Sequence, residues 1–480
     1  MTIYTVWIMI IRNKNNCRNV AGEKMNNKNV IYKKALFLAV PMMIQNGITN
    51  AVSLVDNLMV GRLGTESMTA VSIAGQLIFV FNLAIFGGIS GPGIYGAQYY
   101  GQGNTKGFQD IFRLKLWICV LCALVGIAVF FFGGSRLISL YLHGTSVDID
   151  AGATLEYGLQ YLHIMLLGLI PFSITQVYAS SLRETGESLK PMIAGVASVV
   201  VDVVFNYFLI YGKCGFPRLG VRGAAIATVL ARIVEMTIVI AWSHAKREEH
   251  VFLKGIYRTL KIPMQDMKIV IRKGIPIFAN EFLWAGGIAV LTQCYSIRGL
   301  QVVAGLNISN AICNLLNVVF VAMGNAVGIL IGQYLGASKF EEAKKNSMKL
   351  MWFTGAMCLL LTGILVLCAK GFTSLYDTTP EVKNLGRWFI VITALFFPLQ
   401  GFLNVLYFTL RSGGKTVITF LFDSVFTWVI PVPLAFVLST FTQIPILGVY
   451  AIVQSMDMIK VIVGYILVKK GVWITNLVDS

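Results

Sequence analysis

The stretch VIYKKALFLAVPMMIQNGITNAVSLVDNLMVGRLGT, residues 30–65, decides the fold of this chain. From Ala35 to Val60 it is apolar over more than the ~20 residues that a helix needs to cross ~30 Å of hydrocarbon. Pro41 removes one backbone donor inside this run, and we expect it to kink the helix and act as a hinge. Asp56 lies in the outer part of the run, where a carboxylate costs free energy. Either Asp56 binds a cation or a proton in a polar cavity, or it reaches interfacial water.

Composition assigns the rest of the chain to a membrane as well. Hydrophobic residues make up 56% of it and charged residues 13%, about half the charged fraction of a soluble domain. Long apolar blocks recur, and they are continuous rather than alternating, which excludes a transmembrane β-barrel. We predict an all-α polytopic membrane protein with twelve transmembrane helices, near residues 35–61, 68–98, 111–133, 155–181, 190–211, 221–243, 270–297, 304–333, 350–370, 385–410, 416–439 and 446–468.

The net charge of +17 would suggest a nucleic-acid partner for a soluble protein, but its distribution fits a membrane orientation. With the N-terminus inside, the inner segments hold 28 of the 39 Lys and Arg residues and the outer loops hold nine. These totals count a residue near the end of a span with the adjoining segment, and Arg232 and Lys460 are the two that lie deep within predicted spans. The positive-inside rule therefore predicts a multi-pass protein of the plasma membrane with both termini in the cytoplasm and no nucleic-acid partner.

The chain repeats itself. A shift of 235 residues places Pro41 on Pro276, Gly64 on Gly299, and QYYG (98–101) on QYLG (333–336). Six spans precede the basic segment 244–269 and six follow it, as expected of parallel repeats that form two pseudo-symmetric six-helix bundles with a cleft between them. We predict a disordered cytoplasmic tail over 1–30, with Met25 as an alternative start, a first lobe over 31–243, a cytoplasmic linker over 244–269, a second lobe over 270–470 and a C-terminal tail over 471–480.

Several polar residues lie at helix depth in the first half. Asp202 and Asn206 are four residues apart in the fifth span and therefore share one helix face. Together with Asp56 they could hold a hard cation or share a proton, or they could only form helix-to-helix hydrogen bonds. Thr228 lies in the next span, where its hydroxyl can also bond to its own helix.

The second half carries its own candidates. Glu281 follows the Pro276 kink by five residues, and Asp423 lies in the eleventh span. Each is a candidate for proton or substrate binding, or a group that pairs with a polar neighbour. Arg232 with Glu235, and Asp457 with Lys460, have the i, i+3 spacing of local ion pairs.

Motifs of enzymes are incomplete. Gly413-Gly414-Lys415-Thr416 imitates the end of a phosphate-binding loop, but Thr409 stands where the first glycine is required. No H-E-x-x-H or G-x-S-x-G sequence occurs. We therefore predict no catalytic residues, no cofactor and no metal other than Na⁺, and any uphill transport has to run on an ion gradient.

Taken together, these motifs resemble the multidrug and toxic compound extrusion (MATE) family over about residues 31–470. The resemblance rests on VDNLMVGRLG (55–64), the two QY-x-G turns, NYFLIYG (206–212), LGVRGAAIAT (219–228), PIFANEFLW (276–284) and LRSGGKT (410–416). It implies a monomeric antiporter in the lipid bilayer that exports amphipathic, usually cationic, organic compounds in exchange for Na⁺ or H⁺.

The resemblance also implies roles for individual residues. The family's first-helix Asp matches Asp56 and its sixth-helix Thr matches Thr228, so these two belong to the coupling-cation site. Its fifth-helix pair reads Asn then Asp, whereas this chain has Asp202 then Asn206. Glu281 matches a Glu of the seventh helix that is proposed for coupling or substrate binding. A flippase for lipid-linked sugars and a non-transporting membrane sensor are the alternatives.

Overall fold

The computed structural model describes residues 30–142, 150–248, 250–259 and 261–479. Most of the predicted tail over 1–30, including Met25, lies outside the described residues. The first six helices of the described chain are α3 (Val30–Gly61), α4 (Thr65–Gln102), α5 (Thr105–Leu142), α6 (Ala151–Glu184), α7 (Leu189–Tyr211) and α8 (Val221–Ala245). Two short 3₁₀ turns follow, η1 (Val251–Leu253) and η2 (Ile256–Arg258).

Four long helices open the second half, and two broken spans close it. The long helices are α9 (Met264–Ser296), α10 (Leu300–Gly336), α11 (Phe340–Ser374) and α12 (Pro380–Ser412). The broken spans are α13 (Thr416–Phe420), η3 (Leu421–Val425), α14 (Phe426–Val429) and α15 (Pro431–Phe441), and then α16 (Ile446–Ser455) and α17 (Asp457–Lys470). Twelve stretches of the described chain are long and apolar enough to cross a membrane, which confirms the predicted number of spans.

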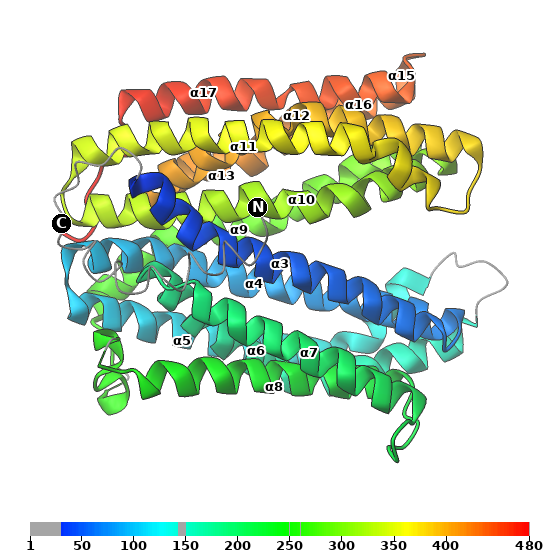
Figure 1. The fold of residues 1–480 in the computed structure, drawn as a ribbon, viewed down its shortest axis with the longest axis horizontal. Coiled ribbons are helices and arrows are strands. Elements are labelled where there is room, and N and C mark those ends of the chain that lie inside the picture. Colours follow the sequence, from blue (N-terminus) through cyan, green and yellow to red (C-terminus); the bar gives the residue numbers. More distant parts are fainter. Residues whose placement is uncertain (1–29, 143–149, 249, 260, 480) are drawn as a thin grey trace.

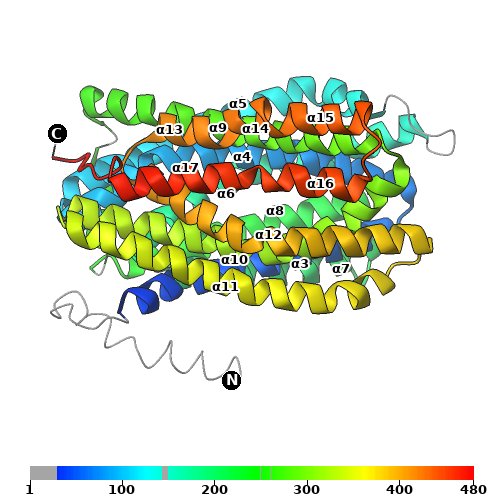
Figure 2. The same cartoon turned by 90° about the horizontal axis from the view of Figure 1, so that it is seen from above.

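The helices lie side by side along one direction, with α3 to α8 below and α9 to α17 above in the view of Figure 1. One apolar core joins α4 to α8 with the 3₁₀ turns of the linker, through residues such as Phe112, Leu169 and Phe252. Two further cores lie wholly within the second half. Figure 2 shows the same bundle from above, with α17 and α16 lying end to end across the middle of the view.

The first helix crosses between the two groups. Its beginning packs into a core made of second-half helices, where Leu38 and Met42 lie with Met323 and Leu350. Its later part carries Asp56, whose carboxylate accepts a hydrogen bond from the amide of Asn206 on α7. Any change at the middle of α3 therefore acts on both groups of helices.

Pro41 lies in the middle of α3, and another side chain replaces the hydrogen bond that its missing backbone N–H would have donated. Pro41 has no N–H for the carbonyl of Phe37, four residues earlier, although α3 runs on through the proline. The buried hydroxyl of Ser188 donates to that carbonyl over 3.0 Å. A side chain at the start of α7 therefore supplies the hydrogen bond that the proline removed, as polar side chains do in membrane helices.

One end of the molecule is closed by contacts that mirror each other. The amide of Gln98 on α4 donates to the carbonyl of Ser412 on α12, and the amide of Gln333 on α10 donates to the carbonyl of Glu184 on α6, each over 2.8 Å. The backbone N–H of Leu477 also donates to Oε1 of Gln98 over 2.7 Å. We call this the sealed end.

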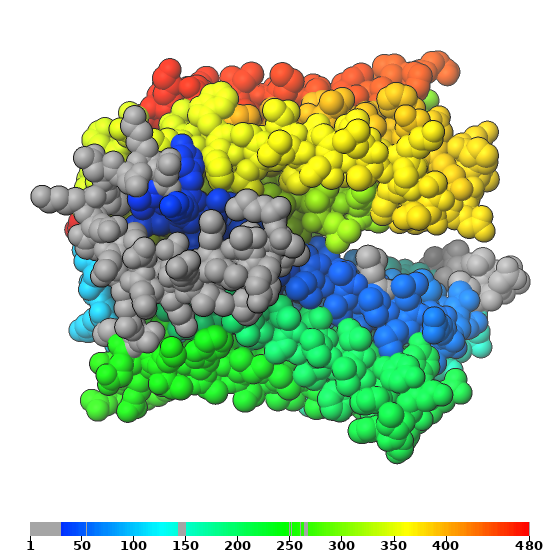
Figure 3. All heavy atoms as spheres, in the orientation of Figure 1, coloured from blue at the N-terminus to red at the C-terminus, as the bar shows by residue number. Residues whose placement is uncertain are grey.

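Glycine allows this closeness. A Cβ on Gly101 would lie 2.0 Å from the carbonyl oxygen of Gln333, and a Cβ on Gly336 would lie 1.9 Å from that of Gln98. At the opposite end the two groups of helices separate, and Figure 3 shows a hollow between the α11–α12 region and α3. The repeated QY-x-G sequences are thus the places where the two halves touch most closely.

The breaks in the last two spans were not predicted. The eleventh span holds the π-helical turn η3 and a further break before Pro431, and the twelfth is interrupted at Met456. A π-helical turn widens the helix by one residue and occurs often at functional sites. Here it carries Asp423.

Ser188→Ala tests the compensation at Pro41. The variant leaves the carbonyl of Phe37 without its donor inside the protein, which should cost ~1–3 kcal/mol and lower the midpoint of thermal unfolding in detergent. Ser374→Ala removes an exposed hydroxyl that bonds only within its own helix and serves as the control. Equal midpoints for both variants would contradict this account.

Gly336→Ala tests the sealed end. The added methyl group collides with the carbonyl of Gln98, so α4 and α10 must move apart. Spin labels at positions 106 and 345 should report a longer distance between the two halves in the variant. In Gly371→Ala the new methyl group meets nothing within 4 Å, and the distance should stay as in the parent.

Candidate functional site

The four residues predicted to bind the coupling cation converge between α3, α7 and α8. The side-chain amide of Asn206 donates to Oδ1 of Asp56 over 2.8 Å. The Asp202 carboxyl lies within hydrogen-bonding range of the Asp56 carboxyl and the Thr228 hydroxyl. Thr228 donates its own proton to the carbonyl of Ala224 over 3.1 Å, which leaves its oxygen able to accept but not to donate.

This cluster lacks positive charge. Asp202 is 6% exposed and Asn206 1%, and the Oδ1 atoms of both are buried without a hydrogen-bond partner. Within the described ranges, no Lys, Arg or His forms an ion pair with Asp56 or Asp202. Removing a carboxylate from water without a partner costs several kcal/mol, and two adjacent carboxylates repel each other. The chemistry of the oxygens suits a proton or a hard cation.

Arg232 lies near this cluster, and its charge acts on Asp202 from beyond ion-pair distance. Its Nη1 donates to the carbonyl of Gly168 over 3.4 Å, and its guanidinium lies 4.9 Å from the centre of the Phe172 ring. The predicted close ion pair with Glu235 is wrong: in the described chain the two side chains are not within ion-pair distance. The i, i+3 spacing permits that contact, but the packing of Arg232 on α6 takes its place.

A cavity of about 240 Å³ lies between α4 and α6. Its lining consists of Asn82, Leu83, Ile85, Phe86, Phe172 and Gln176. Oδ1 of Asn82 is buried without a partner, and the ring of Phe86 is 38% exposed. Apolar and aromatic walls with a few polar groups are typical of small-molecule sites. The nearby Phe81 and Tyr178 are buried in the core of the first half.

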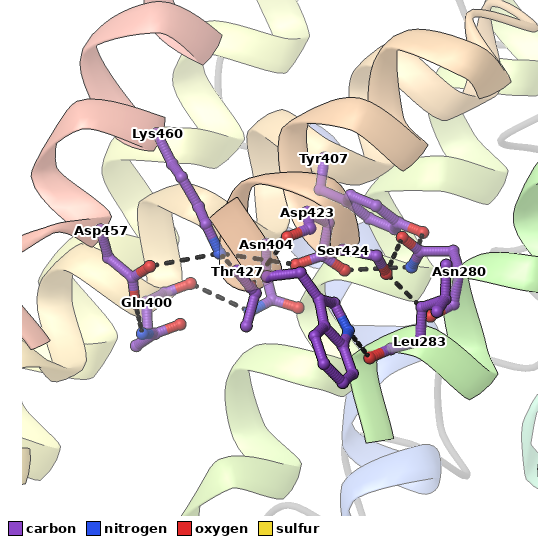
Figure 4. Close-up of polar contacts among 11 residues, drawn as sticks. Asn280, Leu283, Gln400, Asn404, Tyr407, Asp423, Ser424, Thr427, Asp457 and Lys460 are labelled. Carbon is purple, nitrogen blue, oxygen red and sulfur yellow. Dashed lines mark hydrogen bonds and ion pairs between the residues drawn. The ribbon is translucent and has the colours of Figure 1, made fainter. Parts of the chain in front are cut away.

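The second-half candidate Asp423 belongs to a polar network that joins α9, α12 and η3 (Figure 4). The amide of Asn280 donates to Oδ2 of Asp423 over 3.0 Å and to the hydroxyl of Tyr407 over 3.2 Å. Ser424 donates to the backbone and side-chain oxygens of Asn280. Trp428 donates its indole N–H to the carbonyl of Leu283 over 2.8 Å. All three helices are thus held at fixed positions around Asp423.

Lys460 enters the same network from α17. Its ammonium lies 3.3 Å from Oδ1 of Asp457, which confirms the predicted local pair, and 3.7 Å from Oδ1 of Asp423. The second contact joins residues 37 positions apart on different helices, so spacing alone could not have predicted it.

Glu281 forms no hydrogen bond with the described residues of this network. It is half-buried on α9, and the two charges that act on it most strongly are those of Arg411 and Asp423. A Cβ on Gly87 of α4 would lie 3.3 Å from its Cγ, so Glu281 faces the other half of the molecule. Arg411 is 5% exposed and its Nη1 has no hydrogen-bond partner.

Sequence reasoning missed one buried ion pair altogether. Nζ of Lys115 lies 2.5 Å and 2.7 Å from the two carboxylate oxygens of Glu184, and the Lys115 side chain is fully buried. The prediction that Arg232 and Lys460 are the basic residues within spans was therefore wrong, because Lys115 and Arg411 are also buried in α5 and α12. Gly93 and Gly96 of α4 leave the space for Glu184, whose carboxylate a Cβ on either glycine would contact within 2.9 Å.

Comparison with known proteins gives one consistent result. The MatE family model matches residues 41–208 and 276–437. The chain is 26% identical to the probable multidrug resistance protein YoeA of Bacillus subtilis (strain 168) over 89% of its own length and 91% of the relative's. It is 24% identical to the probable multidrug resistance protein NorM of Thermotoga maritima, with 88% of each chain covered. A solved multidrug resistance MATE family transporter in an outward-facing conformation superposes with a TM-score of 0.80 at 20% identity, over 93% of this chain and 98% of that one.

Lys115→Met tests the missed ion pair. The change leaves the Glu184 carboxylate buried without its counter-charge, which should cost ~3–5 kcal/mol and strongly lower the thermal stability of the purified protein. Lys115→Met combined with Glu184→Gln removes both charges and should recover most of that loss. A double variant as unstable as the single one would show that the charge pair does not carry the effect.

Proposed function

Because this chain belongs to the MatE family of multidrug transporters, and is therefore a multi-pass membrane transporter rather than an enzyme, we propose that it is a secondary active antiporter. In this proposal it exports amphipathic, mostly cationic organic compounds across the plasma membrane, with both termini in the cytoplasm, in exchange for Na⁺ or H⁺. The positive-inside distribution of Lys and Arg supports that orientation.

One observation carries the antiport proposal: half-buried Asp56 and buried Asp202 lie together without an ion-pair partner among the described residues. A coupling cation bound there neutralises the two carboxylates and gives the free oxygens of Asp202 and Asn206 a partner. Since Asp56 is on α3 and the others are on α7 and α8, the bound ion draws the later part of α3 toward α7. The exchange of Asp202 and Asn206 relative to the family's order keeps the same donor groups on one helix face.

The proposed coupling acts through the hinge of α3. The beginning of this helix packs with the second half and its later part packs with the first. Bending at Pro41 therefore changes which side chains of α3 line the hollow between the halves. In the proposed cycle, cation entry bends α3 and expels the organic compound, which we place between the halves near Phe86 and Phe172. One charge moving down 100 mV yields ~2.3 kcal/mol, which sustains roughly a fifty-fold gradient of compound.

Asp56→Asn tests the proposal. The amide cannot carry the negative charge that attracts the cation, so cells that express the variant should be as drug-sensitive as cells without the transporter, at equal amounts of protein in the membrane. Asp377→Asn changes an exposed carboxylate in a loop and should leave resistance intact. Retained resistance in Asp56→Asn would refute the assignment.

Dye efflux from proteoliposomes, with Na⁺ and pH gradients imposed separately, identifies the coupling ion. Efflux that follows the Na⁺ gradient assigns Na⁺, and efflux that follows the pH gradient assigns H⁺. A reconstituted protein that moves dye under neither gradient would contradict the antiporter.

A further inference from the structure

The ammonium of Lys460 has the surroundings of a bound cation. Besides the carboxylates of Asp457 and Asp423, at 3.3 and 3.7 Å, it lies 3.4 Å from the hydroxyl of Thr427 and 5.2 Å from the centre of the Phe426 ring. Two carboxylates, a hydroxyl and an aromatic face are groups that bind ammonium and alkali ions. Lys460 itself is 6% exposed. Figure 4 shows its side chain reaching from α17 to the carboxylates of Asp457 and Asp423.

The two carboxylates are fixed by amides on their far sides. Oδ2 of Asp457 accepts from the amide of Gln400 over 2.6 Å, and Oδ2 of Asp423 accepts from that of Asn280 over 3.0 Å. Each carboxylate thus gives one oxygen to an amide and the other to the ammonium. In the described part of the chain, no buried side-chain oxygen or nitrogen of these two aspartates and two amides lacks a hydrogen-bond partner. The site is held in shape by groups other than Lys460.

The first lobe has the opposite arrangement at the equivalent place of the repeat. A shift of 228 residues places Leu219-Gly220-Val221 on Leu447-Gly448-Val449, and it places Arg232 on Lys460. The same shift relates Glu184 to Ser412, the two acceptors at the sealed end. Arg232, however, contacts Gly168 and Phe172 rather than the acidic pair. In the first lobe, Oδ1 of Asp202 and Oδ1 of Asn206 therefore stay without a hydrogen-bond partner. In the second lobe, the basic side chain lies between the acidic ones.

We propose that the Asp423–Asp457 site is a monovalent-cation site whose permanent occupant is the ammonium of Lys460. The Asp423–Asp457 site then takes up no coupling ion, and the acidic cluster of the first lobe does; this last statement rests on the proposed antiport. Without the ammonium the site binds a free cation, either Na⁺ or a small primary alkylammonium.

Lys460→Ala opens the site, and the probes are ethylammonium chloride and NaCl, with choline chloride at equal concentration as the reference. In choline the variant should unfold at a lower temperature than the parent, and its dye efflux should fall ~10-fold or more because two half-buried carboxylates are left without a counter-charge. Ethylammonium or Na⁺ should raise its unfolding temperature in a saturable way, as a ligand of the folded state does. Ethylammonium should restore efflux. The parent protein should show no ethylammonium response.

Three variants make the outcome decisive. Lys460→Arg keeps a permanent positive charge and should retain efflux; if it is as inactive as Lys460→Ala, a lysine that gives up its proton is required and the proposal fails. Adding Asp423→Asn and Asp457→Asn to Lys460→Ala should abolish the response to ethylammonium, and a response that persists would place the binding elsewhere. Asp56→Asn with Lys460→Ala should keep the ethylammonium stabilisation although efflux is lost. That last result separates this inference from the first-lobe assignment.

Lys460→Met provides a second route if Lys460→Ala does not accumulate in the membrane. Its apolar side chain leaves the two carboxylates uncompensated, and Asp457→Asn in the same chain removes one of them. The double variant should therefore unfold at a higher temperature than Lys460→Met alone. If the second change brings no recovery, the ammonium is not compensating these acids and the proposal is overturned.

Discussion

Compensation of charge in a low-dielectric interior governs the polar parts of this protein. An ion moved out of water needs a partner of opposite sign or a set of fixed dipoles. Lys115 with Glu184 and Lys460 with its two aspartates meet that requirement within the chain. Asp56 and Asp202 do not, and this difference separates the structural charges from the pair that we assign to transport.

The two lobes therefore use the same arrangement of acidic, amide and basic groups in two ways. Both carry acidic and amide groups on the proline-containing first helix of the half and on later helices, and both carry a basic residue at the same place in the last helix. In the second lobe that residue enters the acidic cluster, and in the first it packs on α6 through Phe172. In our proposal, the direction of this one side chain decides whether a lobe can respond to an ion from outside.

Much of the fold could be predicted because its signals are local. The apolar blocks predict the spans, and a constant shift between Pro41 and Pro276 predicts the duplication. The i, i+4 spacing of Asp202 and Asn206 puts them on one face, and the family resemblance adds Asp56 and Thr228, which indeed lie beside them. Other contacts could not be predicted, because their partners are far apart in the chain. The spacing of Lys115 and Glu184, or of Ser188 and Phe37, gives no local pattern, and η3 interrupts a sequence that looks uniformly helical.

The mirrored glutamine bonds at the sealed end have a mechanical consequence. Gln98 and Gln333 each reach across to the opposite half, and Gly101 and Gly336 lie directly against the backbone of those same glutamines. A rigid displacement of one half lengthens both bonds together, so neither can yield alone. Parting of the halves at this end is consequently a cooperative, all-or-none event. A closure of this kind is rarely half open, which would limit the leak of small ions through the antiporter that we propose.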